Sequence, residues 1–287
     1  MNPPEPSLSR PSGPAAAPMV RLKMVIAYDG TRYDGWQIQT TGTGVQEKVE
    51  AALAALFPSR PRVHSSSRTD TGVHALGMVA HFDIPASECR IPMRQLPLAI
   101  NAHLPVDVRV LSVHRAPPGF HARFTALGKQ YRYQVWNRPV MNPLLRFTAW
   151  HVPRPLDLGA MRAAAAHFIG THDFRAFSAN PGHPRGSTVR TVRRCEWRRS
   201  GPLLTCIIEA DGFLYKMCRG MVGTMVQVGL GKYRPEDIPR MLAAADRRLA
   251  GMTAPAHGLI LWKVFYPGRN RPAGTATAGA AEASDEE

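Results

Sequence analysis

Polar and apolar residues along the N-terminal half of the chain predict the order strand, helix, strand, strand, helix, strand. Residues 21–28 (RLKMVIAY) alternate as a half-buried strand does, and residues 45–57 (VQEKVEAALAALF) carry apolar side chains at helical spacing. Between them lies a long glycine-rich loop, 29–44. The remaining expected elements are two strands at 62–67 and 75–84, a helix at 93–104 and a strand at 107–116.

The C-terminal half repeats this order loosely. Residues 129–137 alternate as a strand, and residues 158–170 form a good helix that Gly170 is expected to end. An apparent hairpin follows around Ser200, Gly201 and Pro202. The other expected elements are the hairpin strands 187–199 and 203–210, a long apolar helix at 215–231, a helix at 235–250 and a final strand at 259–266.

Two successive βαββαβ units predict an α+β fold made of two ferredoxin-like halves, with antiparallel sheets side by side and a basic cleft between them. We expect an N-terminal α/β half over 20–120 and a C-terminal α/β half over 121–267, joined near 115–128. A cleft at such a junction is the default place for a site. Residues 1–19 and 268–287 have the composition of disordered tails, and the second tail ends in acidic residues.

Charge narrows the choice of partner. The chain has 287 residues with 36 Lys+Arg against 21 Asp+Glu, a formal net charge of +15, and 30 of the basic residues are arginine. Such a field favours a polyanion, most commonly nucleic acid, and arginine suits phosphate contacts and stacking on bases. The alternative is a merely basic surface that reflects a composition rich in Ala, Arg, Gly and Pro.

Several other classes of protein are not expected. The four cysteines show no CxxC spacing, and His64, His74 and His81 lack an accompanying ligand set, so neither zinc nor another metal is predicted. No apolar run is long enough to span a bilayer, and the N-terminal segment lacks the apolar core of a signal peptide. A cytoplasmic protein with reduced thiols is the expectation.

The stretch SRTDTGVHALG (67–77) holds one carboxylate, Asp70, in a turn between two expected strands. Its ordinary role is to cap the backbone at Gly72, with Arg68 as an ion-pair partner. In a basic cleft, however, a lone carboxylate repels phosphate, and its alternative role is that of a nucleophile kept ionised by cations. Arg219, on the apolar helix, is a second candidate partner because a buried arginine normally needs a carboxylate; otherwise it snorkels to the surface.

Aromatic residues supply candidate contacts to bases. Tyr131 and Tyr133 project from the same face of strand 129–137, which suits stacking, although an ordinary core face is the alternative and is favoured for Tyr133. In the glycine-rich loop, Tyr33, Trp36 and Gln37 are expected as exposed contacts to nucleic acid. The alternative is a tryptophan that lies in the core at the base of the loop.

Six segments together resemble the tRNA pseudouridine synthase A (TruA) family. They occur in the family's order and span about residues 22–267; they are SRTDTGVHALGMVAHFD, YDGTRYDGWQ, VQEKVEAAL, FHARFTALGKQYRY, ADGFLYKMCRGMVG and TAPAHGLIL. The resemblance implies an isomerase that converts uridines at positions 38–40 of the tRNA anticodon stem-loop to pseudouridine. It also implies that the enzyme needs no cofactor and works as a homodimer.

The resemblance assigns roles residue by residue. It makes Asp70 the nucleophile, which attacks either ribose C1′ or uracil C6, and Arg219 the cation that keeps it ionised and oriented. Arg68 is placed to fill the space that the flipped uridine leaves. Tyr131 is placed to stack on the uracil and to help remove the C5 proton. A single nucleophile explains why no second acid lies nearby, unlike in glycoside hydrolysis.

Two positions depart from the family pattern, in which Gly is expected at Ser67 and usually Ala at Thr71. If position 67 needs a positive φ, serine there is mildly strained. Substrate range is expected to depend on loops such as 178–188. Two rivals remain open, a non-catalytic RNA-binding protein or chaperone and a hydrolase that acts through an aspartyl intermediate.

Overall fold

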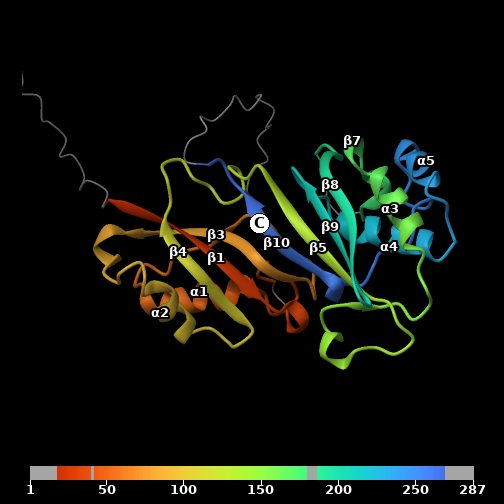
Figure 1. Ribbon diagram of the computed structural model, residues 1–287. Coiled ribbons are helices and arrows are strands. Elements are labelled where there is room, and N and C mark those ends of the chain that lie inside the picture. Colours follow the sequence, from red (N-terminus) through yellow and green to blue (C-terminus); the bar gives the residue numbers. More distant parts are fainter. Residues whose placement is uncertain (1–17, 40–41, 180–185, 269–287) are drawn as a thin grey trace, which may run out of the picture.

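One β-sheet runs through the part of the chain that the computed structural model describes, residues 18–39, 42–179 and 186–268. Its strand order is β4-β1-β3-β10-β5-β9-β8-β7, with β2 also paired to β3 and β6 to β5 (Figure 1). The strands are β1 Met19–Tyr28, β2 His64–Ser65, β3 His74–Pro85, β4 Val108–Arg115, β5 Gly128–Trp136, β6 Trp150–His151, β7 Gly170–Asp173, β8 Val189–Ser200, β9 Leu203–Ala210 and β10 Leu259–Phe265. The expected tails fall almost wholly on residues 1–17 and 269–287, outside the described residues.

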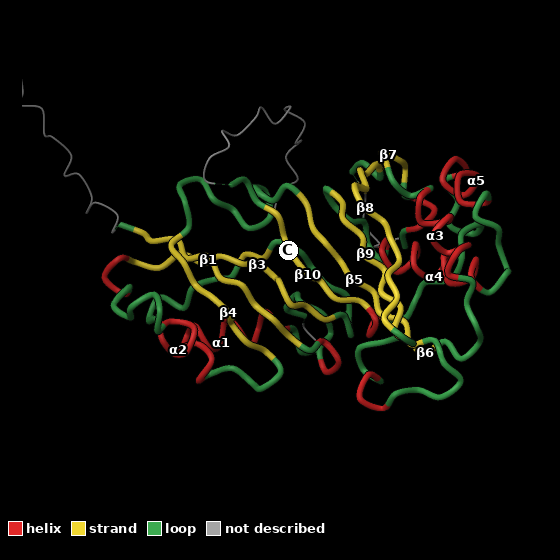
Figure 2. Tube along the Cα trace, in the orientation of Figure 1, coloured by secondary structure: helices red, strands yellow, loops and turns green. Residues whose placement is uncertain are grey.

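Five α-helices accompany the sheet in the described residues, and Figure 2 shows them in two groups, one at each end of it. They are α1 Val45–Leu56, α2 Leu96–Ala102, α3 Leu158–Ala166, α4 Met217–Gly229 and α5 Asp237–Ala244. None of the helices in the described ranges is long and apolar enough to cross a membrane. The fold is therefore α+β with a mostly antiparallel sheet, as the sequence pattern predicted.

One face of the sheet carries the apolar side chains that the helices cover. The register pairs Tyr28 with Ala75, Ala75 with Leu261, Leu261 with Tyr131, and Tyr131 with Ile208, so all five side chains share that face. All five are buried. The sheet thus brings Tyr28 and Tyr131, which are far apart in sequence, onto the same face, with β3 and β10 between their strands.

Helix α4 lies unusually close to its surroundings because it carries glycines where its backbone meets other backbone. A Cβ at Gly220 would collide with the Phe177 carbonyl, and one at Gly223 with the Met252 carbonyl. The rest of the helix is almost entirely buried, as the apolar pattern of 215–231 predicted. This close approach fixes the segment 252–256 against the start of α4.

The junction between the two parts of the sheet differs from the expectation of two antiparallel sheets side by side. The last strand, β10, enters between β3 and β5; it runs parallel to β3 and antiparallel to β5, which makes one continuous sheet. The parallel pairing is short and involves only Ile260 with His74 and Leu261 with Ala75. A strand inserted after a helical crossover can run parallel to a neighbour, which the strand order in sequence alone did not reveal.

Some element boundaries were also wrong. Helix α3 ends at Ala166, and Gly170, with φ +114, begins the short strand β7 instead of ending the helix. Helix α5 ends at Ala244 and is followed by the left-handed residue Ala245, because Asp246 caps the backbone of Arg248 and starts a turn. Strands β6 and β7 were not predicted.

Candidate active site

Asp70 lies in the loop between β2 and β3, and its neighbours tie that loop down on both sides. The Thr69 hydroxyl bonds the Tyr28 hydroxyl at 2.8 Å, and the Thr69 carbonyl accepts from the Trp36 amide at 3.2 Å. The Asp70 carbonyl accepts from the Val73 amide, across a turn in which Gly72 has φ +75. The backbone of Asp70 is therefore held in place while its side chain is left free to meet other groups.

Arg219, in the first turn of α4, supplies the partner of that carboxylate. Its Nη1 donates to Asp70 Oδ2 at 2.8 Å, and the two side chains are only 14% and 19% exposed. Its Nε donates to the Ala254 carbonyl at 2.8 Å, and its own carbonyl accepts from the Ala254 amide. Arg219 is thus tied to Ala254 once through its backbone and once through its guanidinium Nε, which leaves the Nη1 edge to face Asp70.

Tyr131 completes this cluster from β5. Its side chain is buried, and the ring meets Phe213 edge-on at 4.9 Å between centroids. Burial raises the pKa of the Tyr131 phenol, and the nearby Cys218 thiol, Tyr28 phenol and Asp70 carboxylate raise it further. The phenol is therefore neutral at physiological pH, beside a carboxylate that a guanidinium holds.

Of the two departures from the family pattern, Ser67 lies at this cluster. Ser67 has a negative φ, so serine at this position does not have the backbone strain that a positive φ would cause. Its hydroxyl lies close enough to Tyr131 to oppose the rise in pKa, yet Ser67 Oγ is buried without a hydrogen-bond partner in the described part of the chain. Thr71 is exposed.

Arg68 is on the surface of the loop that holds Asp70. It is exposed and forms no hydrogen bond or ion pair with any described residue, so it is not the partner of Asp70 that the capping interpretation required. Its guanidinium is available to a bound molecule next to the carboxylate.

The glycine-rich loop 29–44 differs from the expectation of exposed aromatic contacts, and its residues 40–41 lie outside the described ones. Trp36 is 1% exposed and packs against Tyr28, and Tyr33 is 5% exposed and donates to Asp107 Oδ1 at 2.7 Å. These two side chains are core residues that fix the loop. Burial removes the large apolar surface of each ring from water, which favours the core position over an exposed one. Gln37 is exposed, and its contact with substrate stays a prediction.

Sequence reasoning missed two features that position the cluster. The segment 252–256 orients Arg219 through Ala254 and is itself held by the Tyr133 hydroxyl, which donates to the Pro255 carbonyl at 2.8 Å. Tyr133 is a core residue, as favoured. His74, also buried, accepts from the Gly30 amide through Nδ1 and faces the carbonyls of Phe147 and His257 through Nε2. The motif TAPAHG marked this segment as part of the family resemblance, but it did not predict the contacts that the carbonyl groups of the segment make.

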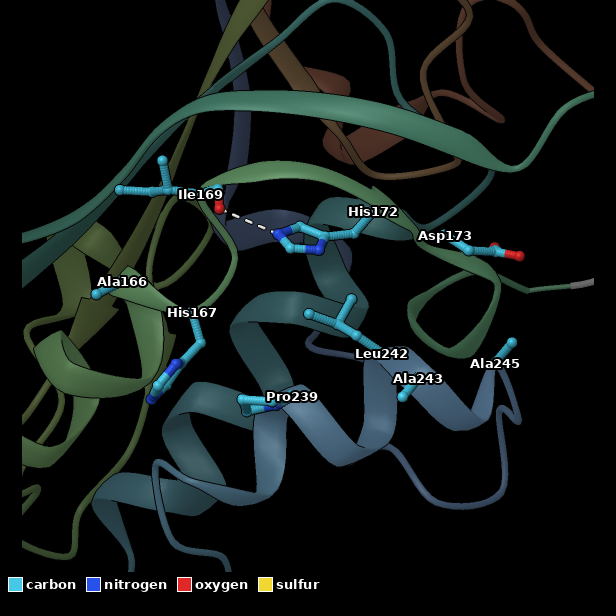
Figure 3. Close-up of a pocket in the computed structure, with 9 residues that line it drawn as sticks. All are labelled: Ala166, His167, Ile169, His172, Asp173, Pro239, Leu242, Ala243 and Ala245. Carbon is cyan, nitrogen blue, oxygen red and sulfur yellow. Dashed lines mark hydrogen bonds between the residues drawn. The ribbon is translucent and has the colours of Figure 1, made fainter.

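A separate hollow of about 630 Å³ lies between α3, β7 and α5 (Figure 3). His172 Nε2 and the Ile169 carbonyl, 3.0 Å apart, form a hydrogen bond on its wall. Figure 3 marks this bond with a dashed line. None of Asp70, Tyr131 and Arg219 lines it. Among the described residues no group of three or more His, Cys, Asp or Glu is arranged to hold a metal ion.

Comparison with known proteins identifies the family. A family model described as tRNA pseudouridine synthase matches residues 24–125 and 164–267, which include Asp70 and Arg219. Proteins named tRNA pseudouridine synthase A from Oleidesulfovibrio alaskensis and Geobacter sulfurreducens are each 45% identical to this chain. The alignments cover 87% and 86% of this chain and 97% and 100% of the relatives. The protein of that name from Bacillus subtilis is 44% identical over 86% of this chain and 99% of its own length. The chain thus belongs to the tRNA pseudouridine synthase family and is a tRNA-modifying isomerase.

Proposed function

We propose that this chain isomerises uridines at positions 38–40 of the tRNA anticodon stem-loop, with Asp70 as the nucleophile. The observation that carries the proposal is the pair formed by Asp70 and Arg219, joined at 2.8 Å from segments 149 residues apart. A partly buried carboxylate held by a guanidinium is aimed in one direction, which covalent catalysis requires.

The reaction balances with this one nucleophile. In attack at ribose C1′, a carboxylate oxygen bonds C1′ as the N1–C1′ bond breaks, and the electron pair goes to uracil N1. The uracil turns over, its C5 bonds C1′ as the carboxylate leaves, and C5 loses its proton while N1 gains one. Attack at uracil C6 also ends with the carboxylate released and the atoms of uridine conserved. No water and no second acid are consumed.

The other residues of the cluster have roles that suit their surroundings. Tyr131 stacks on the uracil, and its neutral hydroxyl relays the C5 proton by accepting it while passing its own proton on. Arg68 fills the position that the flipped uridine vacates, which its exposed guanidinium next to Asp70 favours. Gln37 contacts the RNA from the rim of the loop.

At the level of the molecule, we propose two ferredoxin-like halves, 20–120 and 121–267, with a basic cleft between them and a homodimer as the working form in the cytoplasm. The strand order supports two halves, because β4-β1-β3-β2 and β10-β5-β9-β8 follow the same pattern. Sedimentation at twice the chain mass of 31.5 kDa supports the dimer, and sedimentation as a single chain contradicts it.

Release of tritium from uridine C5 tests the chemistry. With tRNA labelled at uridine C5, the wild-type protein releases label, whereas Asp70→Asn binds the tRNA within about threefold of wild type and releases none. Normal release by Asp70→Asn overturns the role of Asp70. Binding without release by wild type favours the RNA-binding rival, and free uracil or a cleaved strand favours the hydrolase.

Mapping tests the proposed positions. In tRNA from cells that lack this protein, pseudouridine should be missing at positions 38–40 and present elsewhere. Pseudouridine retained at those positions overturns the assignment to the anticodon stem-loop without affecting the family.

A further inference from the structure

Lys129, near the start of β5, carries a charge that no other described residue neutralises. Its ammonium forms no hydrogen bond or ion pair with the described part of the chain, and the side chain is only partly exposed. Its neighbours across the sheet, Ala210 on β9 and Val264 on β10, are both buried. A buried stem with an unpaired ammonium is costly to the free protein and needs an anion as partner.

The position of Lys129 relates it to the active site. It lies two residues before Tyr131 on the same strand, so the two side chains share a face and are about 6.7 Å apart along β5. That separation is comparable with the length of one nucleotide. An RNA strand that presents a uridine to Tyr131 and Asp70 therefore carries a phosphate to the level of Lys129.

The surroundings of Lys129 are cationic. Arg123, on the connection before β5, and Arg190, on β8, both act on it electrostatically. The carboxylate that follows β9, Asp211, is engaged with the backbone amides of Thr191 and Gly212. Burial, followed by the charges of these two arginines, lowers the pKa of Lys129 to about 8. The Asp211 carboxylate keeps its charge in its hydrogen bonds with the two amides but balances at most one of the three cations, so the free protein holds an excess of positive charge here.

We propose that Lys129 binds a phosphate adjacent to the target uridine, with Arg123 and Arg190 completing the anion site. The inference rests on the proposed function, because that function places the uridine at Asp70 and Tyr131. A lysine contacts phosphate as a point charge, which suits a backbone of variable sequence. The site then fixes the register of the strand, so that one uridine and not its neighbour reaches Asp70.

The test uses an anticodon stem-loop RNA with tritium at uridine C5 and single neutral methylphosphonate linkages, introduced one at a time on either side of the target. On the native RNA, Lys129→Gln should raise KM about tenfold, change kcat less than threefold and lower the slope of log affinity against log salt by about one. Lys129→Arg should keep most of the affinity. On the RNA in which the contacted phosphate is neutral, wild type and Lys129→Gln should have the same KM.

Lys263 provides a matched control. It is an exposed lysine on the neighbouring strand, paired with Gln130, and so it projects from the opposite face of the sheet to Lys129. Lys263→Gln removes the same charge and should leave KM on the native RNA within about twofold of wild type.

Alkaline pH provides a second readout. Because the protonated amine binds phosphate, the KM of wild type should rise as pH passes about 8, while the KM of Lys129→Gln should not. Arginine side chains do not titrate in this range, so an inflection near pH 8 is not expected from arginine.

Each outcome decides for or against the phosphate site. The phosphate site is overturned if Lys129→Gln has the KM and the salt slope of wild type. It is also overturned if, at every linkage, the increases in KM from Lys129→Gln and from the methylphosphonate multiply, because the two changes then act independently. If a variant is unstable, the methylphosphonate series on wild type alone tests the phosphate site. If no linkage beside the target uridine raises KM when it is neutral, the site contacts no phosphate there and the proposal is wrong. Failure of wild type to release label would contradict the proposed function instead and is seen before any variant is made.

Discussion

Arg219 connects distant parts of the chain to Asp70, the proposed nucleophile. Its two bonds to Ala254 leave one edge for Asp70, so the orientation of the carboxylate depends on a segment that substrate does not need to touch. The sequence indicated the pair because an arginine on an apolar helix needs a partner. It did not indicate the clamp at Ala254, because that clamp uses backbone groups that every residue carries.

Replacing Arg219 with alanine should affect turnover more than binding. The change leaves the Asp70 carboxylate in a partly buried place without its partner, and we expect kcat to fall on the order of a hundredfold, roughly 3 kcal/mol, with KM within about threefold. Arg240→Ala is the control, because Arg240 is 84% exposed in a long ion pair with Asp237. Equal losses in kcat and in tRNA affinity would identify Arg219 as a plain phosphate contact instead.

At the scale of elements, the sequence predicted helix α4 correctly but did not predict that the aromatic residues of the glycine-rich loop are buried. The apolar run 215–231 predicted a buried helix, and α4 is one. The loop looked exposed because Gly and Asp mark turns, whereas Tyr33 and Trp36 are buried where that loop packs on the loop that holds Asp70. Contacts between two loops leave no periodic signal, and strands of two or four residues such as β6 and β7 are too short to show one.

Gly223→Ala should weaken the protein and its activity together. The new methyl group collides with the Met252 carbonyl, so α4 and the segment 252–256 must separate, and we expect a loss of about 1–3 kcal/mol in the free energy of unfolding. The same displacement moves Ala254 and with it Arg219, so kcat should fall further than the stability loss alone explains. Gly268→Ala is the control, since nothing lies within 4 Å of its new Cβ and it is outside the loop 178–188. If Gly223→Ala is destabilised but keeps the wild-type kcat, the position of the segment 252–256 does not affect catalysis.

At the scale of the whole molecule, contacts join segments that are far apart in the chain, and the sequence did not predict them. The parallel pairing of β3 with β10 is short, and His74 adds contacts to the carbonyls of Phe147 and His257. His81 makes a comparable contact further along β3, where Nδ1 accepts from the amide of Ala122, in the connection that leads from β4 to β5. Both were weighed in the sequence only as metal ligands, because a histidine's backbone partners are set by the tertiary fold.

Acid should therefore weaken the fold through His81 in a defined pH range. Burial, aided by the charges of Arg21, His121 and His64, lowers the pKa of His81 to about 4, against 6.5 for an ordinary histidine. The unfolded chain then binds a proton between about pH 6.5 and 4 that the folded chain does not, so stability falls with pH in that range, by at most about 1.4 kcal/mol per pH unit. The pKa of Asp83, lowered by Arg21, acts below this range.

Urea unfolding of wild type and His81→Asn between pH 4 and 7.5 measures this contribution. The asparagine oxygen can accept from Ala122 but takes up no proton, so the variant should be less stable at pH 7.5 and lose less stability on acidification. His121, whose pKa is also lowered by burial, accounts for part of the remaining slope. His103→Asn, at an exposed position, should keep the wild-type slope. If His81→Asn also keeps that slope, His81 is not the group that gives the fold its acid sensitivity.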